Sequence, residues 1–432
     1  MTAGARDYRL DGIYYQRQEG FFMQRVKLPA GVISSKQART VGEAAERFGQ
    51  GQIHLTTRGS MEIHWISEKD LPELKRVLSG AGLTSRGACG GAVRGITCGS
   101  SAGTGHLPAL EEFARRLQRH FTGNPRFERL PKKFKIGIES TTRGQRHLIQ
   151  DVGLVLADTT DGCNRYDLYA AGGLGREPQP GFLLEKELPE ERVIPMIEAI
   201  LNVYCAGTPP GKRLKHLLRT IGEEEFRVRV LAQPAAQESL PLFKGLPESL
   251  LRAPSGLPLE ARLFAGEISG SRLASLADFA DSWGSGVLTV TADQNIAFQL
   301  PAHVDPTAAQ QALTEAGFAG TTPEEQVHLR VCPGTHECKA GLAPTRDVAR
   351  AIIAALGPAA GERTMALSGC HNSCTQPQLA DIGIVTSGLV KEPNGERAPR
   401  FDLYRAGGDC FGNRVAISLN QEELLALLRS SS

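Results

Sequence analysis

Apolar and polar residues alternate along residues 61–65, whose sequence is Met-Glu-Ile-His-Trp. Alternation is the side-chain period of a β-strand, and a strand that is apolar on one side and polar on the other is typically half-buried. The apolar run extends back to residue 53, so a strand is expected over 53–65. Helices with an apolar side are predicted before and after it, over 41–48 and 71–78.

A larger unit of mixed secondary structure follows. Apolar residues recur at helical spacing after Pro108, a residue that suits the first turn of a helix: Leu110, Phe113, Leu117 and Phe121. Short apolar runs with glycine-rich turns between them predict strands over 133–138, 152–156 and 166–170. Because the helices and strands do not alternate as βαβ units, the pattern favours an α+β fold.

The chain contains this pattern twice. Four pairs of segments match in the same order: 55–61 with 290–296, 77–83 with 312–318, 151–155 with 381–385, and 167–173 with 402–408. The first two pairs share one and the same offset along the chain, and the later offsets drift only slightly. Matches that keep one order along the chain predict an internal duplication.

The composition is that of an ordinary globular protein. With 432 residues and a net charge of +2, the chain can form two or three cores, and nucleic acid or an anionic membrane is not favoured as the main partner. The first residues lack the apolar core of a secretory signal, and no run reaches the roughly 18 apolar residues of a spanning helix. Nine cysteines in a chain of this length favour the reducing cytoplasm, with cysteine serving a metal.

Four cysteines form two close pairs near the C-terminal end. Five residues lie between Cys332 and Cys338, and three lie between Cys370 and Cys374. Four thiolates in such a set suit one [4Fe–4S] cluster. A structural zinc site usually has about two to four residues within each pair, so the wider first pair disfavours zinc without excluding it. Ordinary buried thiols are the other alternative, which the neighbouring glycine, proline and asparagine residues disfavour.

Basic residues form a second set of candidates. In a strand, Lys133-Phe134-Lys135 would place both ammonium groups on one side and the phenyl ring on the other. Two ammonium groups side by side repel each other, and a bound anion or the deprotonation of one lysine relieves the repulsion. Such a pair of lysines suits anion binding and proton donation. A solvated strand edge is the alternative. Arg58 and Arg94 each end a short motif, but sequence spacing does not bring them together.

Together these motifs resemble the siroheme-dependent sulfite and nitrite reductase family. They are the two cysteine pairs, the second within Gly-Cys-x-Asn-x-Cys; Leu-Thr-Thr-Arg ending at Arg58; Val-Arg ending at Arg94; and Lys-Phe-Lys ending at Lys135. Members of that family consist of two fused, pseudo-symmetric halves, so the resemblance covers nearly the whole chain.

The resemblance implies two cofactors, siroheme and a [4Fe–4S] cluster. The cluster ligands would be Cys332, Cys338, Cys370 and Cys374. Of these, Cys374 would also bridge the cluster to the siroheme iron. The face where the anion binds would be lined by Arg58, Arg94, Lys133 and Lys135. A close backbone approach to the macrocycle would be made by Gly172, Gly173 and Gly175, although glycines that serve only a tight bend would give the same pattern.

The resemblance also implies a fold like that of the sulfite reductase hemoprotein, an internally duplicated, pseudo-two-fold α+β protein with ferredoxin-like half-domains. Residues 1–84 and 258–320 would pair as half-domains of one domain. Residues 85–233 would bind siroheme and the anion, and residues 234–257 would link the two copies. Residues 321–432 would bind the cluster and siroheme.

The expected reaction is the six-electron reduction of sulfite to sulfide. Family nitrite reductases of the ferredoxin type tend to carry Lys-x-Asn where this chain has Lys133-Phe134-Lys135, which favours sulfite as the substrate. The sequence lacks a flavin or nicotinamide fingerprint, so a separate ferredoxin or flavoprotein is expected to donate the electrons. Three alternatives stay open: reduction of nitrite to ammonia, an oxygenase resembling precorrin-3B synthase, and a non-catalytic electron-transfer subunit.

Overall fold

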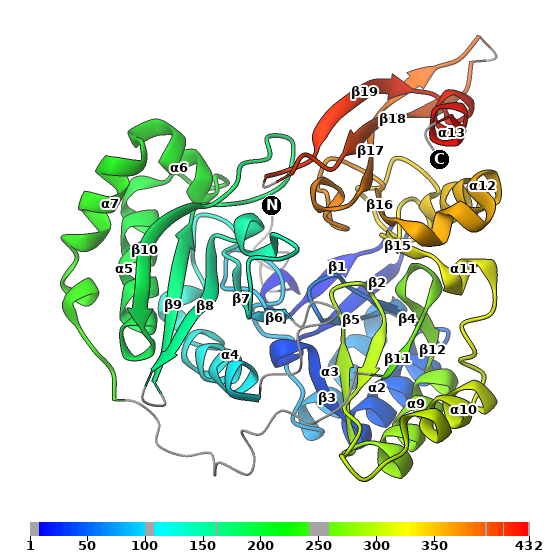
Figure 1. The fold of residues 1–432 in the computed structure, drawn as a ribbon, viewed down its shortest axis with the longest axis horizontal. Helices are drawn as coiled ribbons and strands as arrows, with labels where there is room; N and C mark the ends of the chain where they lie inside the picture. Colours follow the sequence, from blue (N-terminus) through cyan, green and yellow to red (C-terminus); the bar gives the residue numbers. More distant parts are fainter. Residues whose placement is uncertain are drawn as a thin grey trace. The chain divides into compact units, whose positions relative to one another are not determined.

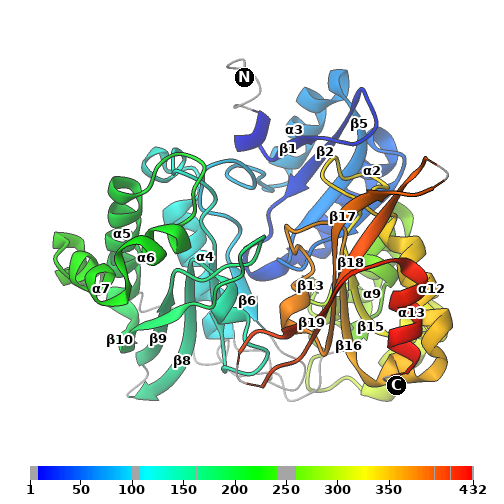
Figure 2. The same cartoon turned by 90° about the horizontal axis from the view of Figure 1, so that it is seen from above.

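The computed structural model describes residues 8–99, 108–160, 163–241, 259–393, 395–408 and 410–430 (Figures 1 and 2). The chain forms two compact units. The first unit comprises Met1–Gly12, Ser85–Gly173 and Glu177–Pro254. The second unit comprises Ile13–Thr84, Leu174–Arg176 and Ser255–Ser432.

Two small sheets of the second unit exchange strands between the two copies of the repeat. Their strands are β1 (Ile13–Tyr15), β2 (Phe21–Val26), β3 (Val32–Ser34), β4 (Gln52–Leu55), β5 (Met61–Ser67), β11 (Leu259–Ala261), β12 (Glu267–Ser269), β13 (Val287–Val290) and β14 (Ile296–Phe298). One sheet has the order β1-β2-β5-β4-β12 and the other has the order β11-β14-β13-β3. Since β3 pairs with β13 and β12 pairs with β4, each copy completes the sheet of the other.

Two helices in equivalent positions pack against each other at close range. They are α2 (Ser35–Phe48) and α9 (Gly270–Trp283), which lie side by side in Figure 1. A Cβ atom on Gly42 would lie 2.6 Å from the carbonyl oxygen of Gly270, and a Cβ atom on Gly270 would lie 2.3 Å from that of Gly42. Glycine at both positions therefore permits the approach, because any larger residue would overlap the backbone of the facing helix.

Equivalent elements of the two half-domains are separated by the same number of positions along the chain. The start of α9 follows the start of α2 by as many positions as the start of α10 (Pro306–Glu315) follows that of α3 (Leu71–Gly80). Even an unusual backbone conformation is repeated, because Ala30 and Ala265 have φ angles of +58° and +56°. The repeat read from the sequence is thus also present in the local structure.

The rest of the second unit is a five-stranded sheet covered by helices. Its order is β15 (His328–Val331), β16 (Thr364–Ser368), β17 (Ile382–Lys391), β18 (Arg397–Arg405) and β19 (Asn413–Leu419). The first three strands are parallel and the last two are antiparallel to their neighbours. Its helices are α11 (Pro323–Gln326), α12 (Thr345–Leu356) and α13 (Gln421–Arg429). Apolar side chains of the strands and of α12 and α13 form one core.

The first unit repeats this sheet with the same order and directions. Its strands are β6 (Thr97–Gly99), β7 (Ile136–Glu139), β8 (Val152–Thr160), β9 (Cys163–Ala170) and β10 (Phe182–Pro189). Again the first three are parallel and the rest antiparallel. Its helices are α4 (Pro108–Phe121), α5 (Glu190–Gly207), α6 (Leu214–Ile221) and α7 (Glu223–Leu231). The predicted duplication and α+β class are therefore confirmed.

Several details differ from the expectations. The strand expected over 53–65 is two strands, β4 and β5, joined by a turn. β5 is buried on both sides rather than one, since Glu62 and His64 are only 5% and 3% exposed. Both polar side chains are covered by neighbouring parts of the second unit, which sequence alternation does not reveal. The strand expected over 133–138 begins only at β7, after a single bridge at Phe134.

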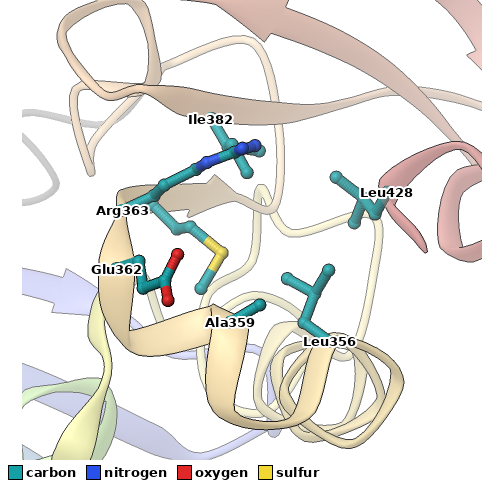
Figure 3. Close-up of a pocket in the computed structure, with 7 residues that line it drawn as sticks. Leu356, Ala359, Glu362, Arg363, Ile382 and Leu428 are labelled. Carbon is teal, nitrogen blue, oxygen red and sulfur yellow. The ribbon is translucent and has the colours of Figure 1, made fainter. Parts of the chain in front are cut away.

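Two further features of the fold are the length of its helices and a small surface hollow. Among the helices of the described residues, none is long and apolar enough to cross a membrane. A small hollow lies between the end of α12, the start of β17 and α13, where Leu356, Ile382 and Leu428 face one another beside Arg363 (Figure 3). The residues that line it include none of the predicted site residues.

The glycine contact between α2 and α9 predicts a stability effect. Gly42→Ala should destabilise the protein by about 1–3 kcal/mol, because the added methyl group overpacks the helix interface. Urea denaturation would measure the change. The control is Gly80→Ala at the end of α3, where an added Cβ meets no atom within 4 Å. Equal effects of the two substitutions would contradict the close-packing explanation.

Candidate metal-cluster and anion site

The four cysteines follow the carboxyl ends of two neighbouring parallel strands. Cys332 comes directly after β15, and Cys370 comes shortly after β16. The strands are parallel, with Val331 opposite Leu367. Because the carboxyl ends of parallel strands meet at one edge of a sheet, both cysteine pairs gather there. We call the two segments 332–343 and 369–376 the cysteine loops.

Glycines let the cysteine loops approach each other. Gly334 has a φ angle of +55°, and a Cβ atom there would lie 2.4 Å from the carbonyl oxygen of Ala343. A Cβ atom on Gly341 would lie 2.3 Å from the Gly334 backbone. The N–H of Gly369 donates a hydrogen bond to Cys332 Sγ at 3.1 Å. Gly334 and Gly341 therefore let the first loop fold back on itself. The two loops meet at Gly369, where a Cβ atom would lie 3.0 Å from the Cα atom of Gly334.

Burial, and to a smaller extent the neighbouring thiols, raise the pKa of Cys332 and Cys338. Although Cys338 as a residue is exposed, protein atoms crowd its thiol, and this burial raises its pKa to about 11, with smaller contributions from Cys374 and Cys370. Burial also raises the pKa of Cys332, followed by the effects of Cys374 and Cys338. Four thiolates can coexist at this edge only if cations balance their charge, as the irons of a cluster would do.

The donor set fits a multi-iron cluster better than a single metal ion. Zinc binds thiolates at about 2.3 Å, which requires sulfur atoms within about 4 Å of one another. Within the described ranges, no group of three or more His, Cys, Asp or Glu side chains is arranged to hold a metal ion. A [4Fe–4S] cluster binds each thiolate to a different iron, so it needs a wider set of four cysteines. After burial, Cys374 and Cys370 contribute to the raised pKa of Cys338, so thiols of both cysteine loops lie near one another.

A buried ion pair anchors the first cysteine loop. Glu337, directly before Cys338, is 3% exposed and accepts hydrogen bonds from Arg346 of α12 at 2.9 and 2.5 Å. Arg346 also forms an ion pair with Glu267 of β12. The amide of Gln52 donates to Glu267 at 3.2 Å and to Glu337 at 3.3 Å. The loop is therefore tied to the sheet that contains β4 and β12.

Arg58 lies in a turn that contacts the second cysteine loop. The turn joins β4 and β5, and Arg58 is half-buried in it. Thr57 Oγ1 donates a hydrogen bond to the carbonyl oxygen of Cys374 at 2.7 Å, and the Gln376 amide donates to the carbonyl oxygen of Thr57 at 3.3 Å. The structure thus brings Arg58 next to the cysteine loops, although the two segments lie far apart in the sequence.

The lysine motif and Arg94 lie on adjacent backbone segments of the first unit. Val93 and Phe134 form a parallel bridge, and the N–H of Arg94 donates to the carbonyl oxygen of Phe134 at 2.8 Å. Phe134 is fully buried, whereas Lys133 and Lys135 are partly exposed. This burial pattern follows the alternation read from the sequence.

The guanidinium of Arg94 is oriented by its own loop. It donates to the carbonyl oxygens of Ala88 and Gly90, the latter at 2.8 Å, and the residue is only 8% exposed. Its buried Nε has no hydrogen-bond partner among the described atoms. An unpaired buried donor costs about 1–3 kcal/mol, and an anionic group beside it would offset that cost.

Asp151 positions the lysine motif from the adjacent strand. Its carboxylate accepts a hydrogen bond from the N–H of Lys135 at 2.8 Å and from Arg213 at 2.7 Å, and it is fully buried. In the second copy, Asp381 accepts a hydrogen bond from the N–H of Thr364 at 2.8 Å. The aspartate of the repeated motif therefore has the same structural task in both copies, which is to hold the start of the neighbouring parallel strand.

The glycine turn after β9 is shaped by two cations that the sequence analysis missed. A Cβ atom on Gly172 would lie 2.1 Å from the carbonyl oxygen of Leu148, and one on Gly173 would lie 2.5 Å from the Arg213 guanidinium. Lys215 Nζ donates to the carbonyl oxygen of Gly173 at 3.5 Å. Burial, followed by the nearby arginines, lowers the pKa of Lys215 to about 8. The basic run Lys212-Arg213-Leu214-Lys215 at the start of α6 is the sequence signal that could have identified them.

Gly175 differs from these two glycines. Its φ angle is +118°, and a Cβ atom there would meet nothing within 4 Å. Packing inside the protein therefore explains Gly172 and Gly173 without a ligand, whereas at Gly175 only the backbone conformation calls for glycine.

The remaining five cysteines lie outside the cysteine loops. Cys89 is buried and Cys98 is partly buried, while Cys163, Cys205 and Cys410 are exposed. Burial raises the pKa of the Cys98 and Cys205 thiols, which keeps them protonated and weakly reactive.

Two family models match the chain. The model of the nitrite/sulfite reductase ferredoxin-like half domain matches residues 14–81 and 252–315. The model of the nitrite and sulphite reductase 4Fe-4S domain matches residues 93–238. Together they cover well over half of the chain. The second match falls on the copy that carries the lysine motif, and the four paired cysteines lie outside both matches.

Similar proteins carry the names of two activities. The protein named sulfite reductase (ferredoxin) 2 from Mycolicibacterium paratuberculosis is 26% identical over 445 residues, which cover 93% of this chain and 79% of the relative. Ferredoxin–nitrite reductase from Synechococcus elongatus is 29% identical over 471 residues, which cover 99% of this chain and 90% of the relative. The solved structure of the Mycobacterium tuberculosis NirA protein has the same fold, with a TM-score of 0.83, 23% identity and coverage of 99% of this chain and 87% of that chain.

The duplicated fold and these matches define an oxidoreductase that uses siroheme and a [4Fe–4S] cluster. The chain belongs to the nitrite and sulfite reductase family. Reduction of sulfite or nitrite is the activity common to this family's named relatives.

The ion pair beside Cys338 predicts a large stability effect. Arg346→Met should destabilise the protein by about 3–5 kcal/mol, because it leaves the buried carboxylate of Glu337 without its partner. Urea denaturation would measure this loss, and the double variant Arg346→Met/Glu337→Met should recover much of it. The control is Arg350→Met on the same helix, where the ion pairs are 3.8 Å long and exposed. Similar losses for both single variants would indicate that the Glu337 carboxylate is solvated.

Proposed function

We propose that this protein reduces sulfite to sulfide, taking up six electrons and six protons and releasing three water molecules. The observation that carries the proposal is the lysine motif, in which Lys133 and Lys135 share the partly exposed side of a segment whose Phe134 is buried. Beside this segment lies Arg94, which has an unpaired buried donor. Two lysines and an arginine next to each other suit a doubly charged, proton-consuming anion.

In this proposal the cluster is held by the cysteine loops. Its ligands would be Cys332, Cys338, Cys370 and Cys374, and Cys374 would also serve the siroheme. The bound cofactors supply electrons to the anion one at a time. Residues 321–432 form the cluster-binding part, residues 85–233 the part that binds siroheme and the anion, and residues 1–84 and 258–320 the paired half-domains.

The protein's own side chains bind the anion and move protons. Arg58 and Arg94 stay charged at any working pH and orient the anion through their fixed donors. Lys133 and Lys135 can each release a proton from Nζ and regain it from water, so they act as proton donors. Gly172, Gly173 and Gly175 make the backbone turn that approaches the macrocycle.

Nitrite is the second candidate substrate. Relatives with 29% and 27% identity are named nitrite reductases, while those named sulfite reductases have 25% and 26% identity. Overall identity therefore does not favour sulfite. The preference rests on Lys135, because a second lysine supplies a further cation and a further proton donor, whereas the asparagine of ferredoxin-type nitrite reductases supplies neither.

Ferredoxin is the proposed electron donor. The named relatives of both activities are ferredoxin-dependent by name. The protein is proposed to work in the cytoplasm, without a nucleic acid or membrane partner.

The choice of substrate predicts a rate ratio. The holoenzyme, supplied with reduced ferredoxin or reduced methyl viologen, should have a higher kcat/KM for sulfite than for nitrite. Lys135→Asn should lower this ratio by about 10-fold or more, since one oriented charge–anion contact contributes about 1.5–3 kcal/mol. A wild-type preference for nitrite would overturn the assignment of sulfite.

The proposed proton donor predicts a split between turnover and binding. Lys133→Met should lower kcat by about 100-fold, the usual contribution of general acid catalysis, while the dissociation constant of sulfite changes much less. Lys132→Met is the control, since Lys132 is the exposed neighbour outside the motif. Weakened binding at unchanged turnover would show that Lys133 binds the anion and does not donate the proton.

A further inference from the structure

Equivalent turns of the two half-domains carry different residues. The turn between β4 and β5 contains Arg58 and Gly59, and the turn between β13 and β14 contains Asp293 and Gln294 at the matching positions of the repeat. Gly59 and Gln294 both have left-handed backbone conformations, with φ angles of +61° and +66°. A non-glycine residue in that conformation costs on the order of 1 kcal/mol, so the Gln294 side chain must make compensating contacts.

The Gln294 amide joins the end of β4 to the end of β15. It is 2% exposed, and its Nε2 donates to the carbonyl oxygens of Leu55 at 2.8 Å and Val331 at 3.0 Å. Its Oε1 accepts from the N–H of Val331 at 2.8 Å. Val331 directly precedes Cys332, and Leu55 is the last residue of β4 before the turn that contains Arg58. One amide group therefore holds both segments.

The surrounding backbone makes room for this side chain. A Cβ atom on Gly266 would lie 2.9 Å from Gln294 Cβ, so glycine is needed there. At the equivalent place in the first copy, a Cβ atom on Gly59 would lie 2.9 Å from the Cα atom of Gly31. The two copies thus share a tightly packed turn, but only the second copy places an amide in it.

Asp293 extends the connection to the second cysteine loop. Its carboxylate pairs with Arg330 at 3.0 Å, and Arg330 is 5% exposed. Arg330 Nε donates to the carbonyl oxygen of Thr375 at 2.9 Å, directly after Cys374. The carbonyl oxygen of Cys374 in turn accepts from Thr57, next to Arg58. The contacts form a closed ring through the Arg58 turn, β15 and the second cysteine loop, and the first cysteine loop begins directly after Val331 of this ring.

We infer that Gln294 is a positioning residue that sets the Arg58 turn and the cysteine loops relative to each other, so that the environment of the cluster and the affinity for the anion depend on the same amide. The part that concerns Arg58 rests on the proposed function. The part that concerns the cluster rests on the family's cofactors and on the contact with Val331.

The test replaces the amide by an isosteric apolar side chain. Anaerobically purified Gln294→Met holoenzyme should keep its iron and siroheme content but show an altered electron paramagnetic resonance spectrum of the reduced cluster. Its KM for sulfite should rise by about 10-fold, the effect of losing roughly 1.4 kcal/mol of orientation, while kcat changes less. Thermal unfolding would be followed in parallel.

The matched control is Gln37→Met in the same unit. Gln37 also uses both ends of its amide, accepting from the N–H of Ser34 at 3.3 Å and donating to the carbonyl oxygen of Ala81 at 3.0 Å, but it caps α2. Its loss should lower the unfolding temperature and leave the cluster spectrum and KM unchanged.

A second variant tests the same ring of contacts if Gln294→Met fails to fold. This variant is Asp293→Asn, since Asp293 is 40% exposed and its replacement leaves the Gln294 amide in place. Asp293→Asn should shift the cluster spectrum in the same direction as Gln294→Met, but less strongly.

The outcomes separate this inference from the proposed function. A lower unfolding temperature with an unchanged cluster spectrum and unchanged KM, as in the control, would overturn the inference while leaving sulfite reduction intact. An altered cluster spectrum in a protein whose wild type does not reduce sulfite would overturn the proposed function and support the positioning role of Gln294.

Discussion

The parallel pairing of β15 with β16 is the constraint on which the proposed cluster site depends. Two parallel neighbours must end at the same edge of a sheet, so cysteines that follow these strands meet there although a whole helical connection separates them in the sequence. The two cysteine loops then lie in close backbone contact, since a Cβ atom on Gly369 would lie 3.0 Å from the Cα atom of Gly334. Strand direction and backbone contact together assemble the four thiols.

Duplication supplied two copies of one sheet, and the copies use opposite ends of it. In the second unit the cysteines follow the carboxyl ends of β15 and β16. In the first unit, Arg94 and the lysine motif precede the amino ends of β6 and β7. The strand order and the aspartate that holds the neighbouring strand are common to both copies. The scaffold is therefore the same in both copies, while the proposed functional residues lie in loops at different ends of it.

Several buried charged side chains lie where the cysteine loops meet the small sheets. Glu62, Glu337, Arg330 and Arg346 are each at most 7% exposed, and charges in such places stabilise a protein only when they are paired and hydrogen-bonded. Here the paired charges join different segments of the chain. Glu62 belongs to β5, and its pairing with Arg25 allows the polar side of that strand to be buried. Burying charges costs desolvation free energy, whereas a network of paired and hydrogen-bonded charges holds its surroundings rigid. These pairs therefore fix the geometry around the thiols more than they add to stability.

The sequence by itself determined the duplication, the α+β class, the two cysteine pairs and the side of the lysine motif, because periodicity and spacing are local properties of a chain. It missed the second buried side of β5, the roles of Arg213 and Lys215, and the Gln294 amide, all of which depend on what another segment places against a residue. The sequence also could not predict that Arg58 lies near Cys374. That proximity follows from the hydrogen bond between Cys374 and Thr57, the residue before Arg58, and the two partners are 317 positions apart. Only the tertiary structure decided these contacts, because strand exchange and parallel pairing act between segments whose separation along the chain carries no information about their distance in space.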